Sequence, residues 1–385
     1  MNSVLLVPVL LINDLRRNSP ELQAELQAAV ERVLARGWYV LGPELERFEA
    51  EFAQWNGAAH CVGVANGTDA LQLALRAVGV QANDLVATVA NAGMYSTTAI
   101  RAMGAIPAYV EVEQARLTMD AEALAHLLRT QPKIKAVIVT HLYGQLADLD
   151  SLLSLTAARG IPLIEDCAQA HGAQRNGRKA GTFGDIGCFS FYPTKNLGAC
   201  GDGGALLTAN AQLAERLRSL RQYGWGKKYV VEHAGGCNSR LDEMQAAILS
   251  AKLPRLAARN ERRRAIAQRY QTAFAALPLK TPSLLDAHTD KSYVAHLYVI
   301  RVAERAALQA YLQAHGIGFD IHYPVPDHCQ PIAQKDSVIV SALAFTERLC
   351  GEVLTLPCFP EMTEAEVEHV IQVVTQFFRS HVSAE

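Results

Sequence analysis

The sequence contains no Cys-x-x-Cys pair and no large excess of either charge. Its eight cysteines stand singly along 385 residues, a scatter that argues against a disulfide framework and for reduced thiols in a cytoplasm. It has 36 Lys and Arg against 38 Asp and Glu, a formal net charge of −2, which gives no electrostatic attraction to nucleic acid or to an anionic membrane surface. We therefore expect neither nucleic acid nor a membrane as a partner.

Long apolar runs are also absent. No run reaches the roughly 18 apolar residues that a membrane span requires. The apolar start, Val4 to Ile12, has no basic segment before it and no small-residue cleavage site, so we interpret it as an arm or first strand rather than a signal peptide. No Gly-x-Gly-x-x-Gly sequence opens the first helix, so the fingerprint of a nicotinamide dehydrogenase is missing. These absences leave a soluble, cytoplasmic enzyme as the expectation.

What is present is the composition of a compact enzyme, with half of the residues hydrophobic and 19% charged. This length favours one large core and a second, smaller domain. We place residues 1–250 in the large domain and residues 251–385 in the small one. Strand-like and helical segments alternate in the first half of the chain, which indicates a parallel or mixed sheet covered by helices on both faces.

Apolar periodicity predicts the individual elements. Helices are expected at residues 21–36, 44–55, 70–78, 151–159, 242–253, 256–277, 305–315 and 364–379, and strands at 61–64, 84–89, 106–112, 136–141, 162–165 and 292–302. The helix at 256–277 carries five arginines, which we interpret as one solvated face. They are Arg259, Arg262, Arg263, Arg264 and Arg269.

Lys195 stands in the most informative segment of the chain. It follows the apolar run Gly187–Phe191 and precedes the glycine-rich Gly201–Gly204, a poor context for a solvated surface charge. Asp166 follows another apolar run, at a strand end where ligand sites collect, and Gln169 could reach the same ligand. A buried lysine and such a carboxylate suit pyridoxal phosphate, because the lysine forms a Schiff base and the acid keeps the ring nitrogen protonated.

Two further segments suit a phosphate group. Gly67, Thr68 and Asp69 join a strand to a helix start, where free amides and the positive end of the helix dipole favour an anion. Ser190 lies five residues before Lys195, and its hydroxyl could donate to the same phosphate. Each signal also has a structural interpretation: capping of the helix by Thr68 or Asp69, an ion pair for the lysine, or a turn cap for the acid. Their order along the chain favours a pyridoxal phosphate site.

At these residues the chain resembles the DegT/DnrJ/EryC1/StrS family of sugar aminotransferases, which are fold-type-I pyridoxal phosphate enzymes. Seven ordered motifs carry the resemblance over nearly the whole chain: Trp38–Pro43 with Glu49, Asn66–Leu71, His141–Gln145, Glu165–Gly172, the lysine segment through Gly204, Asn238–Ala247 and His322–Pro326. The resemblance implies an α/β fold with three αβα layers. A mixed, mostly parallel seven-stranded sheet would be joined by a smaller C-terminal α/β domain.

The resemblance also implies roles for single residues. Lys195 would form the Schiff base and move the proton, Asp166 would pair with the ring nitrogen, and Gln169 would contact the ring hydroxyl. The phosphate would be bound by Gly67, Thr68 and Ser190, with Asp69 beside them, and by Asn238 from a partner subunit. That last role implies a homodimer with shared active sites.

The substrate would lie near the first helical segment, Tyr223, His322 and Tyr323. Many members of the family stack an aromatic ring on the cofactor after the second strand. Tyr95 is the one ring in the corresponding stretch, Asn91–Thr97, and is our candidate for that role. No metal site is expected.

Within this family, the motifs His141–Gln145 and Asn238–Asp242 resemble enzymes that aminate C3 of dTDP-linked 3-keto-6-deoxyhexoses, with L-glutamate as the amino donor. Amination at C4 of a 4-keto-6-deoxyhexose and at C3 of a UDP-linked 3-keto hexuronic acid remain alternatives. A sugar dehydratase on the same scaffold would carry histidine in place of Lys195, and a non-catalytic regulator would lose Asp166 or Lys195. The sequence retains both residues, which disfavours these two classes.

Overall fold

The computed structural model describes residues 9–282, 291–333 and 337–381. Its centre is an eight-stranded sheet in which the five strands after β8 are all parallel to their neighbours, whereas β9 runs antiparallel to both of its own. In spatial order the strands are β1 (His60–Val64), β9 (Gly204–Thr208), β8 (Ile186–Ser190), β5 (Leu163–Asp166), β4 (Ile134–Thr140), β2 (Leu85–Val89), β3 (Ile106–Val110) and β13 (Val338–Ile339).

Seven of these strands form the mixed, mostly parallel sheet that we expected, and β13 adds an eighth at the edge beside β3. Val338 pairs with Ala108 and Ile339 with Tyr109. The count of seven is therefore one strand short. A two-residue strand has too few positions to show a period of two, so the sequence pattern could not predict it.

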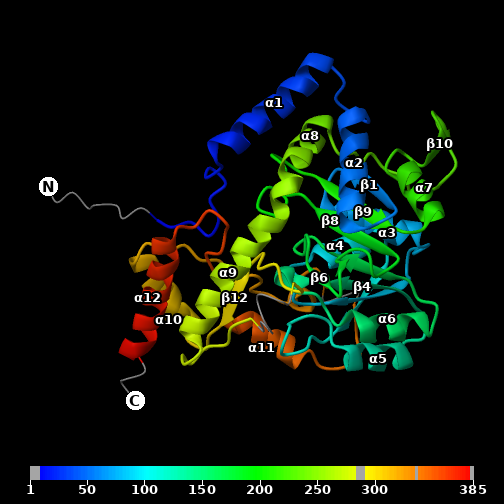
Figure 1. Cartoon of the computed structure of the whole chain (residues 1–385). Coiled ribbons are helices and arrows are strands. Elements are labelled where there is room, and N and C mark those ends of the chain that lie inside the picture. Colours follow the sequence, from blue (N-terminus) through cyan, green and yellow to red (C-terminus); the bar gives the residue numbers. More distant parts are fainter. Residues whose placement is uncertain (1–8, 283–290, 334–336, 382–385) are drawn as a thin grey trace.

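Alternate residues of the central strands belong to two different hydrophobic cores. In β4, for example, Val137 and Val139 belong to one core, while Ala136 and Ile138 belong to the other. The helices α2 (Pro43–Asn56), α5 (Ala121–Thr130) and α6 (Leu149–Ala157) contribute to the first core, and α3 (Gly67–Ala77), α4 (Tyr95–Ala102) and α7 (Ala211–Leu220) to the second. Two helical layers thus cover the two faces of the sheet (Figure 1), which confirms the three-layer fold.

The C-terminal part of the chain has its own small sheet, in which β12 (Tyr298–Arg301) pairs antiparallel with β14 (Val353–Leu356). Around it lie α10 (Arg305–Ala314), α11 (Ala344–Glu352) and α12 (Glu364–His381), next to the long helix α9 (Leu256–Phe274). This smaller α/β unit agrees with the expected architecture. The boundary at residue 250 stays a prediction.

The arginines of α9 do not form a solvated face. Arg262 pairs with Glu364 of α12 at 2.7 Å, and Arg269 pairs with Glu368 at 3.1 Å. Arg263 is buried, and its guanidinium donates to the Cys358 carbonyl. The interpretation was wrong because the acidic partners lie about 100 residues further along the chain.

The expected strand at 292–302 is also shorter than predicted. Only its second half forms β12, since the Leu146 N–H donates to the Ser292 carbonyl and the Val294 N–H donates to the Gly144 carbonyl, both within 3.0 Å. The first half of this segment therefore binds the turn η1 (Leu142–Gly144) rather than a strand.

The remaining elements lie at the periphery. Helix α1 (Pro20–Arg36) projects from the body and packs on α8 (Glu243–Lys252). Two small hairpins are formed by β6 (Gln174–Arg175) with β7 (Arg178–Lys179) and by β10 (Trp225–Lys227) with β11 (Val230–Val231). Most of the apolar start lies outside the described residues, and Leu10 forms a bridge to Ile317. Among the described residues, no helix combines the length and apolar character that crossing a membrane requires.

Candidate active site

The sheet brings distant residues to one edge. Strands β8, β5, β4 and β2 are parallel, and β1 shares their direction because β9 runs antiparallel to both β1 and β8. Their carboxyl ends therefore meet at one edge, where a cavity of about 660 Å³ lies. Eight of the nine predicted cofactor residues line it: Gly67, Thr68, Asp69, Tyr95, Asp166, Gln169, Ser190 and Lys195.

Lys195 and Asp166 both line this cavity, and the charge of each affects the pKa of the other. Burial lowers the pKa of Lys195 to about 8, an effect that the negative charge of Asp166 opposes. Burial raises the pKa of Asp166, which the Ala168 N–H and the charge of Lys195 oppose. A lysine with a pKa near 8 is partly neutral at physiological pH, so its Nζ is a competent nucleophile and base.

Strand β5 directs two adjacent acids to opposite sides. Asp166 points to the cavity, where its Oδ1 accepts the Ala168 N–H at 3.1 Å and Thr140 Oγ1 lies 3.4 Å from Oδ2. Glu165 points into the core, where it accepts the N–H groups of residues 181, 183 and 184 and binds His141 Nε2 at 3.0 Å. The alternation of a strand thus gives one acid to the site and the other to the fold.

The helix start of α3 forms a cradle against the end of β8. Asn66 caps the helix, its Oδ1 accepting the Asp69 N–H at 2.8 Å, so neither Thr68 nor Asp69 is the cap. The first-turn N–H groups of Gly67 and Thr68 have no partner within a helix. A Cβ on Gly67 would lie 2.6 Å from the Cβ of Ser190, so only glycine allows this close approach. An anion such as phosphate fits this cradle.

Gln169 is held by hydrogen bonds at both ends of its amide. Its Oε1 accepts the Tyr143 N–H at 2.6 Å, and its Nε2 donates to the Tyr323 hydroxyl at 3.1 Å. The Tyr323 ring contacts Tyr95 edge-on, with the ring centroids 5.9 Å apart. The loop that contains Tyr323 therefore reaches the cavity from the C-terminal part of the chain.

Four predicted residues are not among those that line the cavity of this single chain: Asn238, Tyr223, His322 and Tyr323. Asn238 is exposed, and Tyr223 is 40% exposed beside Trp225. His322 binds Thr355 Oγ1 through its Nδ1 at 2.8 Å. Asn238 and Tyr223 are exposed on this chain, and their roles stay predictions.

The structure also adds residues that the sequence reasoning did not name as site residues. Thr140 ends β4 as Asp166 ends β5, so the rule that found the acid could have found the threonine. Asp202 lies in the glycine-rich stretch already noted after Lys195. Tyr192, 52% exposed, had no signal beyond its nearness to Lys195.

The set of groups fits pyridoxal phosphate. The cavity offers a primary amine with a lowered pKa, a carboxylate for a ring nitrogen, an amide for a ring hydroxyl, and a helix start with a serine for a phosphate. The cradle at Gly67, which no larger residue could occupy, is the feature that fits the phosphate most specifically.

Comparisons with known proteins point in the same direction. The model of the DegT/DnrJ/EryC1/StrS aminotransferase family matches residues 20–375. The chain is 44% identical over 367 residues to the dTDP-3-amino-3,6-dideoxy-alpha-D-galactopyranose transaminase of Aneurinibacillus thermoaerophilus, covering 94% of this chain and 98% of that protein.

Two further comparisons are equally extensive. The dTDP-3-amino-3,4,6-trideoxy-alpha-D-glucose transaminase of Micromonospora megalomicea subsp. nigra is 43% identical over 359 residues, which covers 92% of this chain and 95% of that protein. The solved structure of DesV from S. venezuelae superposes with a TM-score of 0.91 at 42% identity, over 96% of this chain and 98% of that one.

Proposed function

Because the chain belongs to the DegT/DnrJ/EryC1/StrS aminotransferase family, we propose that it transfers the amino group of L-glutamate to C3 of a dTDP-linked 3-keto-6-deoxyhexose. It is an aminotransferase, and its cofactor is pyridoxal 5′-phosphate. The observation that carries the proposal is the convergence of Lys195, Asp166 and Ser190 on one cavity. The C3 position is supported by the two relatives that are named for 3-amino sugars.

When bound, the cofactor supplies an aldehyde that takes up the amino group and a ring that accepts electrons. Lys195 Nζ would hold it covalently in the resting enzyme. Once displaced by the amino donor, the same Nζ would move a proton between the carbon that carries the nitrogen and the cofactor. Its pKa of about 8 suits that task near neutral pH.

The other residues of the cavity would orient the cofactor and stabilise its charges. Asp166 would face the ring nitrogen, whose positive charge would favour the ionised carboxylate against the effect of burial. Gln169, fixed by Tyr143 and Tyr323, would contact the ring hydroxyl. The phosphate would lie at the start of α3, near Gly67, Thr68, Asp69 and Ser190, and Tyr95 would stack on the ring.

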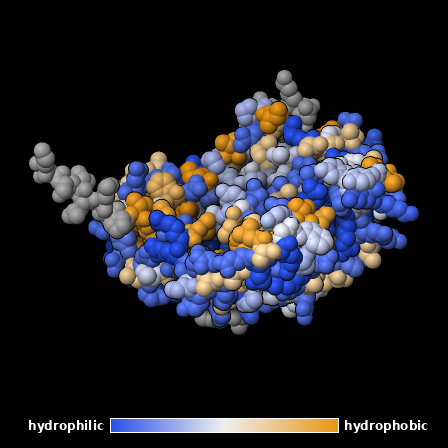
Figure 2. Space-filling view, turned by 90° about the horizontal axis from the view of Figure 1, so that it is seen from above, coloured by the Kyte–Doolittle hydropathy of each residue, from blue (hydrophilic) through white to orange (hydrophobic). Residues whose placement is uncertain are grey.

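A second copy of the chain would complete the site. Asn238 would bind the partner's phosphate, and Tyr223, His322 and Tyr323 would lie around the sugar nucleotide. The face that carries α1 shows several hydrophobic patches (Figure 2). Trp38, 54% exposed, stands at the end of α1, and exposed aromatic residues are enriched at protein interfaces. This exposure supports a homodimer.

The setting of the reaction is part of the same proposal. All eight cysteines are free thiols, which supports a reducing compartment such as the cytoplasm. Residues 1–250 would form the cofactor domain and residues 251–385 the small domain. The amino sugar would be consumed by glycosyl transfer, for example into a lipopolysaccharide O-antigen or another glycan.

The position of amination can be tested in the reverse direction. Purified enzyme is incubated with 2-oxoglutarate and, in separate reactions, a dTDP-3-amino-6-deoxyhexose, a dTDP-4-amino-6-deoxyhexose and a UDP-linked 3-amino hexuronic acid. We expect glutamate to form fastest with the first sugar and not to form with a Lys195→Ala control. Turnover of the 4-amino sugar alone would contradict the C3 assignment but not the transaminase chemistry.

A further inference from the structure

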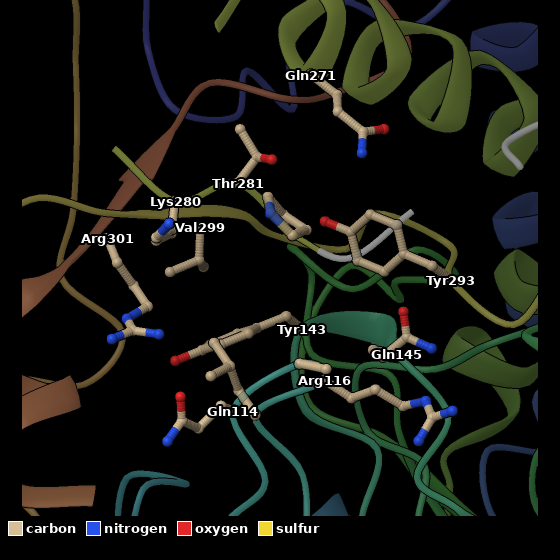
Figure 3. Close-up of a pocket in the computed structure, with 13 residues that line it drawn as sticks. Gln114, Arg116, Tyr143, Gln145, Gln271, Lys280, Thr281, Tyr293, Val299 and Arg301 are labelled. Carbon is tan, nitrogen blue, oxygen red and sulfur yellow. The ribbon is translucent and has the colours of Figure 1, made fainter. Parts of the chain in front are cut away.

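A second cavity, of about 440 Å³, is lined by the residues drawn as sticks in Figure 3. Its walls come from the loop at residues 114–117 after β3, the turn at Tyr143–Gln145, Gln271 of α9, residues 280–282, and the segment from Tyr293 to Arg301. The described residues that line it differ from all of those around Lys195. It is therefore a separate site.

The lining is rich in hydrogen-bond donors, and no Asp or Glu occurs among the described residues that form it. Three cationic side chains and three side-chain amides surround the space in Figure 3: Arg116, Lys280 and Arg301, with Gln114, Gln145 and Gln271. Lys280 and Arg301 lie side by side, since a backbone bridge joins these two residues. The Nε2 of Gln145 already donates to the Leu146 carbonyl and to Ser292 Oγ. The remaining donors, with no carboxylate among the described lining residues, favour an oxyanion.

Two of these cations are partly compensated by carboxylates that are not among the lining residues. Arg301 uses Nε and Nη2 on one oxygen of Glu352, at 3.0 and 2.8 Å, and Arg116 uses Nη1 on Glu113 at 2.9 Å. Each guanidinium retains further N–H donors. No ion pair of Lys280 occurs within the described parts of the chain. The side chains that the structure describes around the cavity therefore carry a small net positive charge, which matches a ligand with one or two negative charges.

The floor of the cavity is aromatic and apolar. The hydroxyl of Tyr293 donates to the Leu297 carbonyl at 2.7 Å, and that of Tyr143 donates to the His322 carbonyl. These hydroxyls are occupied, so the two rings offer mainly carbon surface, together with Leu117 and Val299. Such a floor accommodates an organic body, which a bare inorganic ion would leave uncovered.

Tyr143 forms a wall of this cavity and also touches the residues that hold the first one. Its N–H binds Gln169 Oε1 at 2.6 Å, its hydroxyl binds the His322 carbonyl, and Gln169 in turn binds Tyr323. A ligand packed on the Tyr143 ring therefore acts on the residue whose backbone N–H holds Gln169 and whose hydroxyl holds the loop at 322–323.

We propose that this cavity binds a small organic anion bearing a carboxylate or a phosphate, and that Tyr143 transmits its binding to the cofactor site. The binding part of this inference is independent of the proposed function, which it uses only for the spectral readout from the bound cofactor.

Binding is tested by titration calorimetry on the holoenzyme, with benzoate as the carboxylate probe and phenyl phosphate as the phosphate probe, because neither is a substrate, a product or a nucleotide of the proposed reaction. The same titrations are made on Lys280→Ala and on Lys133→Ala, a control that removes an exposed lysine outside both cavities. We expect Lys280→Ala to lower the affinity for one probe about tenfold or more, because one charge-assisted hydrogen bond is lost. Lys133→Ala should leave that affinity unchanged. Equal affinities of both probes for all three proteins would overturn the proposal.

Transmission is tested with Tyr143→Phe, which keeps the ring and removes the hydroxyl that binds the His322 carbonyl. The probe that depends on Lys280 should change the visible absorbance or circular dichroism of the cofactor in the parent enzyme. In Tyr143→Phe it should still bind within about twofold, since no ligand contact is removed, but should change the spectrum much less. An equal spectral change in both proteins, or none in the parent, would refute the role of Tyr143. Neither readout depends on which sugar is aminated.

Discussion

The two cavities of this chain are built from different kinds of backbone. The first is made at strand ends and a helix start, with Lys195 and Asp166 buried and their pKa values shifted by burial. The second is made mainly of loops and turns, and its cations are either exposed or paired with carboxylates that are not among the lining residues. Burial shifts the pKa values of ionisable groups and so prepares them for proton transfer and nucleophilic attack, whereas exposed cations keep their charge and can bind an anion. Substitutions in the first cavity should therefore affect the catalytic rate, and substitutions in the second should affect ligand binding.

The largest contrast is between the two lysines. Lys195→Ala should lower amino transfer at least about 10⁴-fold, because covalent attachment and proton transfer are lost together. Lys280→Ala should leave the activity without added anion unchanged. Steady-state rates measure both, and borohydride reduction followed by peptide mapping should place the cofactor on Lys195.

Lys179 is an internal control for that mapping, because burial lowers its pKa too although it lies outside both cavities. Labelling of Lys179 in place of Lys195 would show that a lowered pKa alone selects the attachment site. The role assigned to the first cavity would then be wrong.

The next contrast lies within the first cavity, between the two acids of β5. Asp166→Asn should reduce kcat about 10²–10³-fold with little loss of stability, since burial already opposes its charge. Glu165→Gln should instead lower the free energy of unfolding by about 3 kcal/mol or more, because its new amide would face backbone N–H donors of residues 181–184.

Chemical denaturation and steady-state kinetics on both variants measure this separation. A large stability loss in Asp166→Asn with normal kcat would mean that Asp166 serves the fold rather than the chemistry.

A third substitution tests the cradle at the start of α3. The Cβ of Gly67→Ala would lie 2.6 Å from the Cβ of Ser190, so the helix start must move away from the phosphate position. Loss of one or two charge-assisted hydrogen bonds should weaken cofactor binding between about ten- and a hundredfold. Gly351→Ala in α11, where an added Cβ meets nothing within 4 Å, is the control. Cofactor affinity is measured by titrating the apoenzyme. Equal affinities of Gly67→Ala and Gly351→Ala would show that the start of α3 does not bind the cofactor phosphate.

The two cavities also differ in how far the sequence could predict them. Asp166 and Ser190 each end a strand and the segment at 67–69 follows one, and a general rule gathers strand ends at one edge of a parallel sheet. Tyr323 reaches Gln169 from 154 residues further along the chain, and no local pattern encodes that contact. The same holds for Lys280 and Tyr143, which only the docking of the small sheet brings to one cavity.

Other features escaped prediction for physical reasons of the same kind. The ion pairs of Arg262 and Arg269 depend on where α12 packs, and β13 is too short to show a period. Asn238 and Tyr223 are exposed in the single chain, and the role predicted for Asn238 is one toward a second copy. Long-range docking and association, rather than local propensity, decide all of these.

The smallest expected effect comes from pH, and it isolates the environment of the first cavity. With the pKa of Lys195 lowered from 10.5 to about 8, the neutral amine should rise from a tenth to nine tenths of the population between about pH 7 and about pH 9. The rate at which apoenzyme captures pyridoxal phosphate should therefore increase about tenfold and then level off. Because the charge of Asp166 raises the pKa of Lys195, Asp166→Asn should move the midpoint to lower pH, while Lys280→Ala should leave it in place. A rate whose midpoint lies near pH 10.5, the ordinary pKa of lysine, would mean that Lys195 is not desolvated in the way that distinguishes the first cavity from the second.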